Sequence, residues 1–295
     1  MRIRVPSAAA LCLPLLLAGC SLFPTTRKLP VPKAPAIVQT VTPEQLVTQL
    51  NKRWDDLQTL NSKVTIQASE EKTAEGLEKT APTFQAVILL RKPENLRVYG
   101  FVPVIRTEAF DMVSDGKTFT IYVPSRKQVM KGSNALKKKS ANELENLRPG
   151  FFFNAMVVRG VEPDELYSVT ADTETVEDPA KKHLLITPEY VLSVMRQKPG
   201  SRQLTPVRVV TFNRDDLLPY QQDVYDDDGN LSTQVFYSRY RDFGGIKYPS
   251  SMTIKCPIAG IQLVITVLSV DENQALKDDQ FQSSYPADTP VKSLD

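Results

Sequence analysis

The sequence predicts a mainly β protein (α+β) with few helices, in which one large antiparallel sheet dominates. Three observations lead to this prediction: about a dozen strand-like segments, turn signals between them, and only two stretches of helical character. The chain has 295 residues. Beyond its first 42 residues, its length suits one β-rich domain with a sizeable core.

One helix is clearly indicated near the start of this domain. Thr42-Pro43-Glu44-Gln45 supplies a capping Thr, a Pro at the first helical position and a Gln three residues after the cap. Leu46, Leu50, Trp54 and Leu57 then follow at spacings of four, four and three, which places them on one face. This amphipathic helix needs an apolar surface to cover.

Nearly everything after this helix alternates or runs apolar as strands do. Asp115-Gly116 between two apolar segments is a hairpin signal, and the run from Asp226 to Asn230 predicts a tight acidic turn because it lacks the ligand pattern of a calcium loop. The expected strands are Ser62–Ser69, Thr83–Arg91, Asn95–Tyr99, Thr107–Val113, Thr118–Val123, Arg126–Lys131, Leu166–Asp172, His183–Thr187, Tyr190–Gln197, Val207–Phe212, Pro219–Asp226, Ser232–Tyr240, Tyr248–Cys256 and Ile261–Val270.

A second helical stretch interrupts the strands. Ser140 to Glu143 matches a capping box, and Pro149-Gly150 is expected to end the helix. The apolar run from Phe151 to Val158 follows. Two interpretations remain open: the run covers one face of the sheet as a lid, or it completes the core.

The N-terminus has the features of a secretory signal. Arg2 and Arg4 precede an apolar segment from Ala8 to Leu17, which is too short to span a bilayer. The following Leu17-Ala18-Gly19-Cys20 resembles the bacterial lipobox. That resemblance implies cleavage after residue 19 and acylation of Cys20, and Ser21 after the cysteine implies sorting to an outer membrane.

These features divide the chain into four parts. Residues 1–19 are the expected signal peptide, and residues 20–42 a lipid-anchored, Pro-rich tether of extended character. Residues 43–285 form the folded domain, and residues 286–295 a C-terminal tail.

Composition excludes several classes of function. Cleavage removes Arg2 and Arg4 from the 36 basic residues, which leaves a chain balanced against its 34 acidic residues. Nucleic-acid binding needs a basic excess, so no nucleic-acid partner is expected. Cys256 is the one cysteine of the body, so we expect no disulfide within it.

The sequence contains no pattern of catalytic or metal-binding residues. His183 is the only histidine and lies in an expected strand without Cys or acidic partners at motif spacing. No G-x-S-x-G, H-E-x-x-H or glycine-rich phosphate loop occurs. We therefore predict no catalytic residue, no metal and no cofactor, and a protein that is not an enzyme.

The order of these parts resembles the LolA/LolB-type bacterial lipoprotein carrier superfamily. Three local patterns carry the resemblance: the D-G hairpin from Ser114 to Pro124, the G-x-x-x-P entry from Asp242 to Pro249, and Asn273 with Asp278-Asp279-Gln280-Phe281 at the close. The resemblance extends over roughly residues 42 to 285. It implies an unclosed antiparallel β-barrel, a half-barrel, whose concave apolar face is capped by helices and receives acyl chains.

From this resemblance we expect an outer-membrane lipoprotein that faces the periplasm and acts as a carrier or receptor for lipid or for the acyl chains of lipoproteins. Its expected partners are membrane lipids, lipidated proteins and a possible soluble periplasmic carrier. The alternative is a structural or sensory envelope lipoprotein that uses the same fold to bind a partner protein. The residues expected in the cavity are Leu50, Trp54, Phe84, Phe110, Met112, Phe119, Ile121, Phe152, Phe153 and Met156.

One loop carries a separate hypothesis. Gly100 and Pro103 predict a turn between two strands, yet Phe101, Val102, Val104 and Ile105 are apolar where a loop is usually polar. In the resembled family, membrane-anchored members have an apolar loop at a corresponding place. The loop therefore dips into the bilayer or touches acyl chains during their handover, or it folds back into the core.

Overall fold

The computed structural model describes residues 38–70, 80–102, 105, 107–135, 140, 143–178 and 183–294. The expected signal peptide, Cys20 and most of the tether lie outside the described residues, as does Val104.

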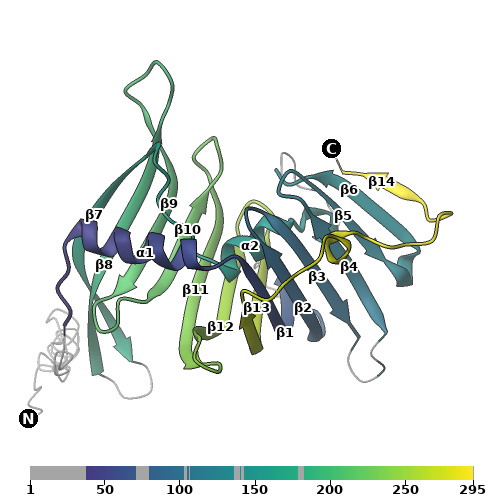
Figure 1. Ribbon diagram of the computed structural model, residues 1–295, viewed down its shortest axis with the longest axis horizontal. Helices are drawn as coiled ribbons and strands as arrows, with labels where there is room; N and C mark the ends of the chain where they lie inside the picture. The colour runs from purple at the N-terminus through teal and green to yellow at the C-terminus, as the bar shows by residue number, and fades with distance from the viewer. Residues whose placement is uncertain are drawn as a thin grey trace, which may run out of the picture.

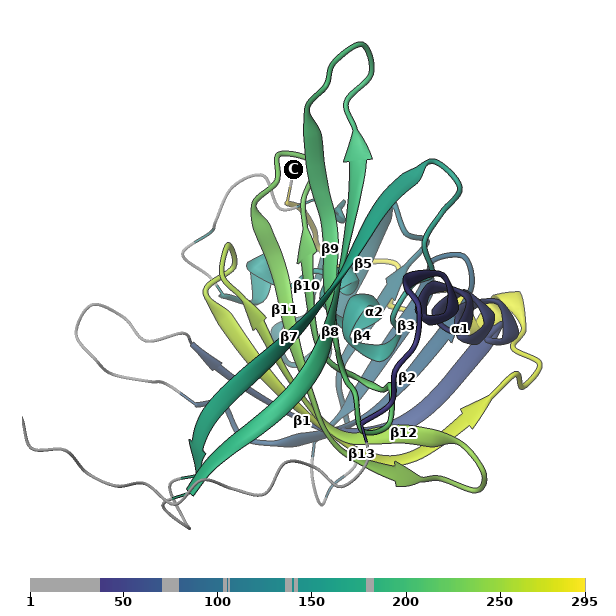
Figure 2. The ribbon, with the colours of Figure 1, turned by 90° about the vertical axis from the view of Figure 1, so that its left-hand side faces the viewer.

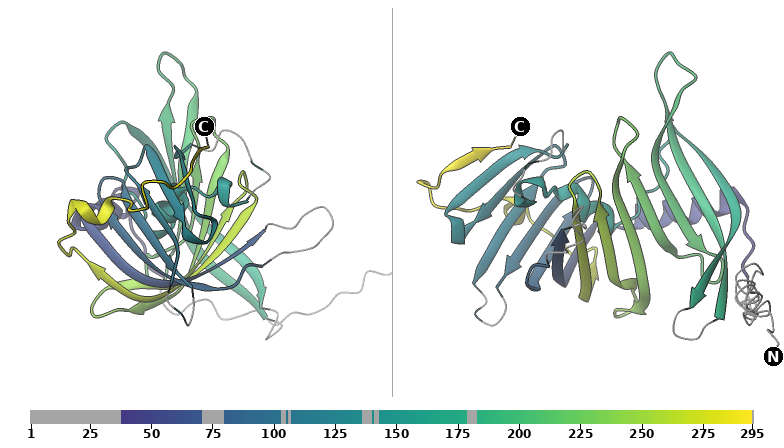
Figure 3. Two further views of the ribbon diagram at one scale, coloured as in Figure 1. Left: turned by 90° about the vertical axis from the view of Figure 1, so that its right-hand side faces the viewer. Right: turned by 180° about the vertical axis from the view of Figure 1, so that it is seen from behind.

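One curved sheet of fourteen strands makes up most of the described chain, in the order β14-β6-β5-β4-β3-β2-β1-β13-β12-β11-β10-β9-β8-β7. The two ends of this sheet, β7 and β14, lie at opposite ends of the molecule and do not meet, as Figures 1 and 3 show. The expected unclosed half-barrel is confirmed. The strands in its first half are β1 (Thr59–Glu70), β2 (Phe84–Arg91), β3 (Asn95–Phe101), β4 (Glu108–Ser114), β5 (Thr118–Val123) and β6 (Gln128–Ser133).

The second half of the sheet comes from the later part of the chain, and it joins the first half where β13 pairs with β1. All neighbours are antiparallel except β14, which adds to β6 in parallel. The strands are β7 (Glu165–Asp178), β8 (His183–Gln197), β9 (Leu204–Asn213), β10 (Pro219–Tyr225), β11 (Leu231–Asp242), β12 (Lys247–Cys256), β13 (Ile261–Glu272) and β14 (Val291–Ser293).

Two α-helices lie within the curve of the sheet, as the view in Figure 2 shows. Helix α1 (Pro43–Asp56) begins at the expected capping box: the Gln45 amide donates to the Thr42 hydroxyl at 3.2 Å, and the Thr42 amide donates to Gln45 Oε1 at 2.8 Å. Helix α2 is Pro149–Met156. Short 3₁₀ turns occur at Pro124–Arg126, Glu143–Asn146 and Asp278–Phe281.

Helix α2 corrects the prediction for the second helical stretch. Pro149 begins a helix instead of ending one, and only a 3₁₀ turn forms at Glu143–Asn146. The physical reason is that proline needs no amide hydrogen bond at the first helical position, and its fixed φ suits the start of a helix. The apolar run that follows is therefore helical.

Three strand predictions also need correction. The two segments expected at His183–Thr187 and Tyr190–Gln197 form one strand, β8, which runs through Pro188. The segment expected from Arg126 begins at Gln128, because Lys127 takes a left-handed φ of 46° after the 3₁₀ turn. Finally, β3 continues through Gly100 to Phe101, so the turn begins after the expected place.

The buried side chains form two clusters on the inner face. The larger one packs α2 against β1 to β6 and β11 to β13, with Phe152 and Met112 among its fully buried members. The smaller one packs Leu46, Val47 and Leu50 of α1 against Tyr190, Leu192 and Val194 of β8 and Val210 and Phe212 of β9. Each helix thus covers its own part of the sheet.

The C-terminal segment crosses β2 to β4 before it reaches β6. Arg91 pairs with Asp278 at 2.7 Å and lies over the Phe281 ring, and an Arg97 guanidinium nitrogen donates to the Gln280 carbonyl. Arg97 also binds the buried Asp111 with two nitrogens, at 2.8 and 3.0 Å. These contacts fasten residues 276–281 to the first half of the sheet.

Candidate functional site: an apolar cavity between the two helices

A cavity of about 360 Å³ lies where the two buried clusters meet. Its walls come from α1, from the end of α2 and from the strands between β9 and β13, and Val158 packs against both clusters. The apolar lining residues are Leu46, Leu50, Trp54, Leu57, Met156, Val157, Val158, Phe212, Leu217, Pro219, Ile246 and Pro249.

Helix α1 forms one wall because its apolar stripe is longer than the cluster it covers. Leu46, Val47 and Leu50 are buried on β8 and β9, whereas Trp54 and Leu57 lie beyond them and pack on the larger cluster. Lys92 donates to the Trp54 carbonyl at 2.5 Å and its ammonium lies 4.1 Å from the centre of the indole ring. The helix therefore spans the gap between the clusters.

Tyrosine hydroxyls fix the end of α2 at the inner side of the cavity. Tyr248 donates to the Met156 carbonyl at 2.5 Å, and Tyr237 donates to the Asn154 carbonyl at 3.4 Å. These bonds satisfy carbonyls that a helix end leaves without intrahelical partners. Burial raises the pKa of both hydroxyls well above the ordinary value, so both remain neutral donors. Apolar walls with internally satisfied polar groups suit an apolar guest.

The rim of the cavity is charged. Gln49, Arg53 and Asp56 of α1 face Lys247 and Glu272 of β12 and β13. Burial raises the pKa of Glu272, and the Arg53 charge opposes that shift. The cavity thus has apolar and aromatic side chains on its walls, and its exposed lining residues carry both signs of charge.

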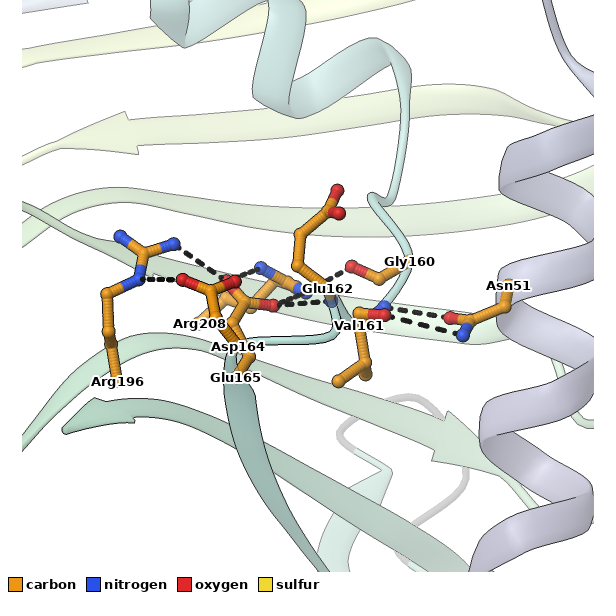
Figure 4. Close-up of polar contacts among 8 residues, drawn as sticks. All are labelled: Asn51, Gly160, Val161, Glu162, Asp164, Glu165, Arg196 and Arg208. Atoms are coloured by element: carbon orange, nitrogen blue, oxygen red, sulfur yellow. Dashed lines mark hydrogen bonds and ion pairs between the residues drawn. The ribbon is translucent and has the colours of Figure 1, made fainter.

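A polar network holds α1 against the second half of the sheet (Figure 4). The Asn51 amide exchanges two hydrogen bonds with the backbone of Val161, at 2.8 and 3.4 Å. Immediately after this loop, Glu165 of β7 is buried and accepts from Arg208 of β9 at 2.7 and 3.2 Å. Arg196 of β8 donates to the same carboxylate at 3.2 Å.

The same network also holds the loop that joins α2 to β7. Arg208 also donates to the Gly160 carbonyl, and the Glu162 amide donates to Glu165 at 3.0 Å. Gly160 lies so close to α1 that an added Cβ would sit 2.8 Å from the Asn51 side chain. The network therefore sets the distance between α1 and the link from α2 to β7.

The residues expected in the cavity separate into two groups. Leu50, Trp54 and Met156 line it. The others belong to the larger cluster, where Phe84 is partly buried and packs edge-on against Phe110 at 5.3 Å. The buried members of that second group are Phe110, Met112, Phe119, Ile121, Phe152 and Phe153.

Sequence reasoning missed the tyrosines Tyr237, Tyr240 and Tyr248 as lining residues. Their strands were expected, and the alternation within each strand could have placed these rings on the inner face. The buried Glu165–Arg208 pair was also missed, because its members are distant in sequence and match no motif.

The residues expected in the apolar loop after β3 lie in different environments. Phe101 lies in β3, where its ring meets Tyr99 edge-on at 4.6 Å. Val102 is half-buried and its amide donates to the Thr107 carbonyl. Ile105 is 67% exposed. The described part of the loop therefore offers one large apolar side chain to the outside.

Within the described ranges, no cluster of three or more His, Cys, Asp and Glu side chains is arranged to hold a metal. Cys256, the only cysteine among the described residues, is buried in β12. Neither α1 nor α2, nor any other helix of the described chain, has the length and apolarity needed to cross a bilayer.

Comparison with solved structures identifies the fold. The chain is similar to a LolA superfamily protein from Nitrosomonas europaea, with a TM-score of 0.50 and 15% identity, over 83% of this chain and 99% of that one. A DUF1329 family protein from Desulfovibrio piger gives a TM-score of 0.50 at 17% identity, over 81% and 95% of the two chains.

A third similar structure is a putative outer membrane lipoprotein-sorting protein domain from Vibrio parahaemolyticus, with a TM-score of 0.48 and 13% identity, over 80% and 94% of the two chains. No family model matches the sequence, and no curated protein matches it either. The chain has a LolA/LolB-type fold, as its sequence pattern led us to expect.

Proposed function

We propose that this protein binds one or more acyl chains, of a lipid or of a lipoprotein, in the cavity between α1 and α2. The observation that carries the proposal is a cavity of about 360 Å³ inside the half-barrel, with apolar and aromatic side chains on its walls. Ligand sites of this kind begin at about 300 Å³. Each methylene transferred from water into such a site contributes about 0.8 kcal/mol.

The wider role we propose is that of a carrier or receptor in lipoprotein localisation, anchored through Cys20 in an outer membrane and facing the periplasm. The lipobox-like Leu17 to Cys20 supports the anchor, and the LolA/LolB-type fold supports the role. Lipidated proteins and a soluble periplasmic carrier are the partners that this role requires.

Filling the cavity tests the binding proposal. The test uses the protein from residue 21 to residue 295, and the substitution Ile246→Trp places a large ring at the cavity wall. We expect it to weaken 1:1 binding of a fluorescent 16-carbon fatty acid at least ten-fold, which is about 1.4 kcal/mol. Titration fluorimetry measures the change. Leu268→Trp, at a 54% exposed position on β13, is the matched control and should bind normally. Equal binding by both variants, or none by the unmodified chain, contradicts the proposal.

We also propose that the loop after β3 touches the membrane surface through Ile105, whose exposure supports this contact. Ile105→Asp should reduce cosedimentation of residues 21–295 with phosphatidylethanolamine and phosphatidylglycerol vesicles several-fold. Its melting temperature should stay unchanged, because the side chain is exposed. Leu268→Asp is the control. If both variants sediment as the unmodified chain does, the loop is not a membrane contact.

A further inference from the structure

The two ends of the sheet differ in how their edge strands are covered. At one end, β14 and the segment before it cover β6. At the other end, β7 is 14 residues long and, among the described strands, pairs only with β8. The pairing runs from Glu165 to Asp178 without a register shift. Proteins usually blunt long open edges with a bulge, a proline or charged side chains, and of these β7 carries only carboxylates. Carboxylates repel another acidic strand but not a basic one.

The hydrogen bonds show which backbone groups of β7 face the open side. Thr173 lies opposite Pro188, which has no amide hydrogen and whose carbonyl accepts from Arg214 on the other side of β8. The Thr173 amide instead donates to the Asp172 carboxylate at 2.7 Å. In an antiparallel ladder the bonded and open residues alternate. Tyr167, Val169, Ala171 and Thr173 therefore direct both backbone groups outward.

The side chains of β7 define what chemistry fits this edge. On the inner face, Tyr167 is 39% exposed and Val169 is half-buried against the α1 cluster. The opposite face carries Asp172 and Glu174, both exposed. Strand β7 has no Lys or Arg, and none of the ion pairs found among described residues involves Asp172 or Glu174.

Glu189 of β8 adds to this acidic stripe. It lies directly opposite Asp172 in the ladder and is buried, with its carboxylate accepting from the Tyr220 hydroxyl. Burial raises the pKa of Glu189, and the charges of Glu174 and Asp172 raise it further. Among the described residues, no positive group counts against the effect of these two neighbours on Glu189, so a cation brought to this face would be attracted to it.

We propose that the open edge of β7 is a docking site for an extended basic segment of a partner protein, which adds to the sheet as a further strand. Main-chain bonds to Tyr167, Val169, Ala171 and the Thr173 carbonyl supply affinity, and alternate basic side chains next to Asp172 and Glu174 supply specificity. A second copy of this chain fits poorly, because antiparallel pairing of two β7 strands sets carboxylates against carboxylates.

The test uses isotope-labelled residues 21–295 and a ten-residue peptide in which lysine alternates with valine and threonine. On binding, amide exchange measured by NMR should slow at least ten-fold at Tyr167, Val169 and Ala171, whose amides face the open side. Ala171→Pro removes an outward amide without breaking a β8 bond, so it should keep its melting temperature and lose the peptide. The peptide with glutamate in place of lysine should not bind.

Charge variants distinguish docking at β7 from a general electrostatic attraction between the protein and a basic peptide. Asp172→Lys with Glu174→Lys should reverse the preference to the glutamate peptide. The control Asp227→Lys with Asp288→Lys makes the same charge change at exposed positions outside β7 and should keep the lysine peptide.

Absence of peptide binding, binding without slowed exchange in β7, or normal binding by Ala171→Pro overturns the proposal. A doubled molecular mass at neutral pH, with slowed exchange at the same amides, also overturns it, because a second copy of this chain would then occupy the edge. Ile246→Trp should leave docking intact, so this test is independent of the cavity.

Discussion

Glu165→Gln is expected to destabilise the protein by about 3–5 kcal/mol, because it leaves a buried guanidinium without its charged partner. The side chains of Glu165 and Arg208 are 1% and 5% exposed, and this carboxylate accepts from both Arg208 and Arg196. The neutral amide offers one acceptor fewer and turns an NH₂ group towards these donors. Urea unfolding followed by circular dichroism measures the loss.

Two controls isolate the buried pair. Asp164→Asn removes the outer contact to Arg196, a 3.5 Å pair with both side chains at least half exposed, and should cost less than about 1 kcal/mol. Glu165→Leu combined with Arg208→Met replaces the pair by apolar groups and should recover most of the loss. A Glu165→Gln variant within 1 kcal/mol of the unmodified chain would mean that water reaches this site.

Phe152→Ala is the second substitution with a large expected effect, about 3–5 kcal/mol. Phe152 is 1% exposed and is among the largest fully buried side chains of the protein. Its truncation removes apolar contacts and leaves a hole between α2 and the sheet. The measurement is again urea unfolding, and Leu268→Ala at an exposed position should stay within about 0.5 kcal/mol.

This result also decides between the two interpretations of the apolar run from Phe151 to Val158. If α2 completes the core, Phe152→Ala carries the full cost. If α2 were a loosely held cover, the loss would fall below about 1 kcal/mol, since a mobile helix contributes little packing. The tyrosine bonds to Asn154 and Met156 favour the first outcome.

Local signals predicted much of the fold. The Thr42 capping box formed as expected, and Asp115-Gly116 made the turn between β4 and β5, with Gly116 at a φ of 91°. The acidic turn also formed: Asp226 accepts from the amides of Asp228 and Asn230. Each of these features depends on a few neighbouring residues, so the sequence contains the whole cause.

Features that join distant segments could not be predicted in this way. The pairing of β1 with β13 and the parallel addition of β14 to β6 follow from how the whole sheet curves. The same holds for the cavity. Sequence reasoning placed Leu50, Trp54 and Met156 there, but it could not separate them from residues such as Met112, because both groups have the same apolar character.

The pairing of β1 with β13 has a consequence for biosynthesis. Leu60 pairs with Glu272, so β1 to β6 and β7 to β12 stay separate half-sheets until β13, the strand that unites them, has paired with both β1 and β12. Until then both half-sheets expose a central edge, and closing so long a loop is slow. A chain that ends before Ile261 would therefore keep two half-sheets with exposed central edges, which makes it prone to aggregate and dependent on a chaperone.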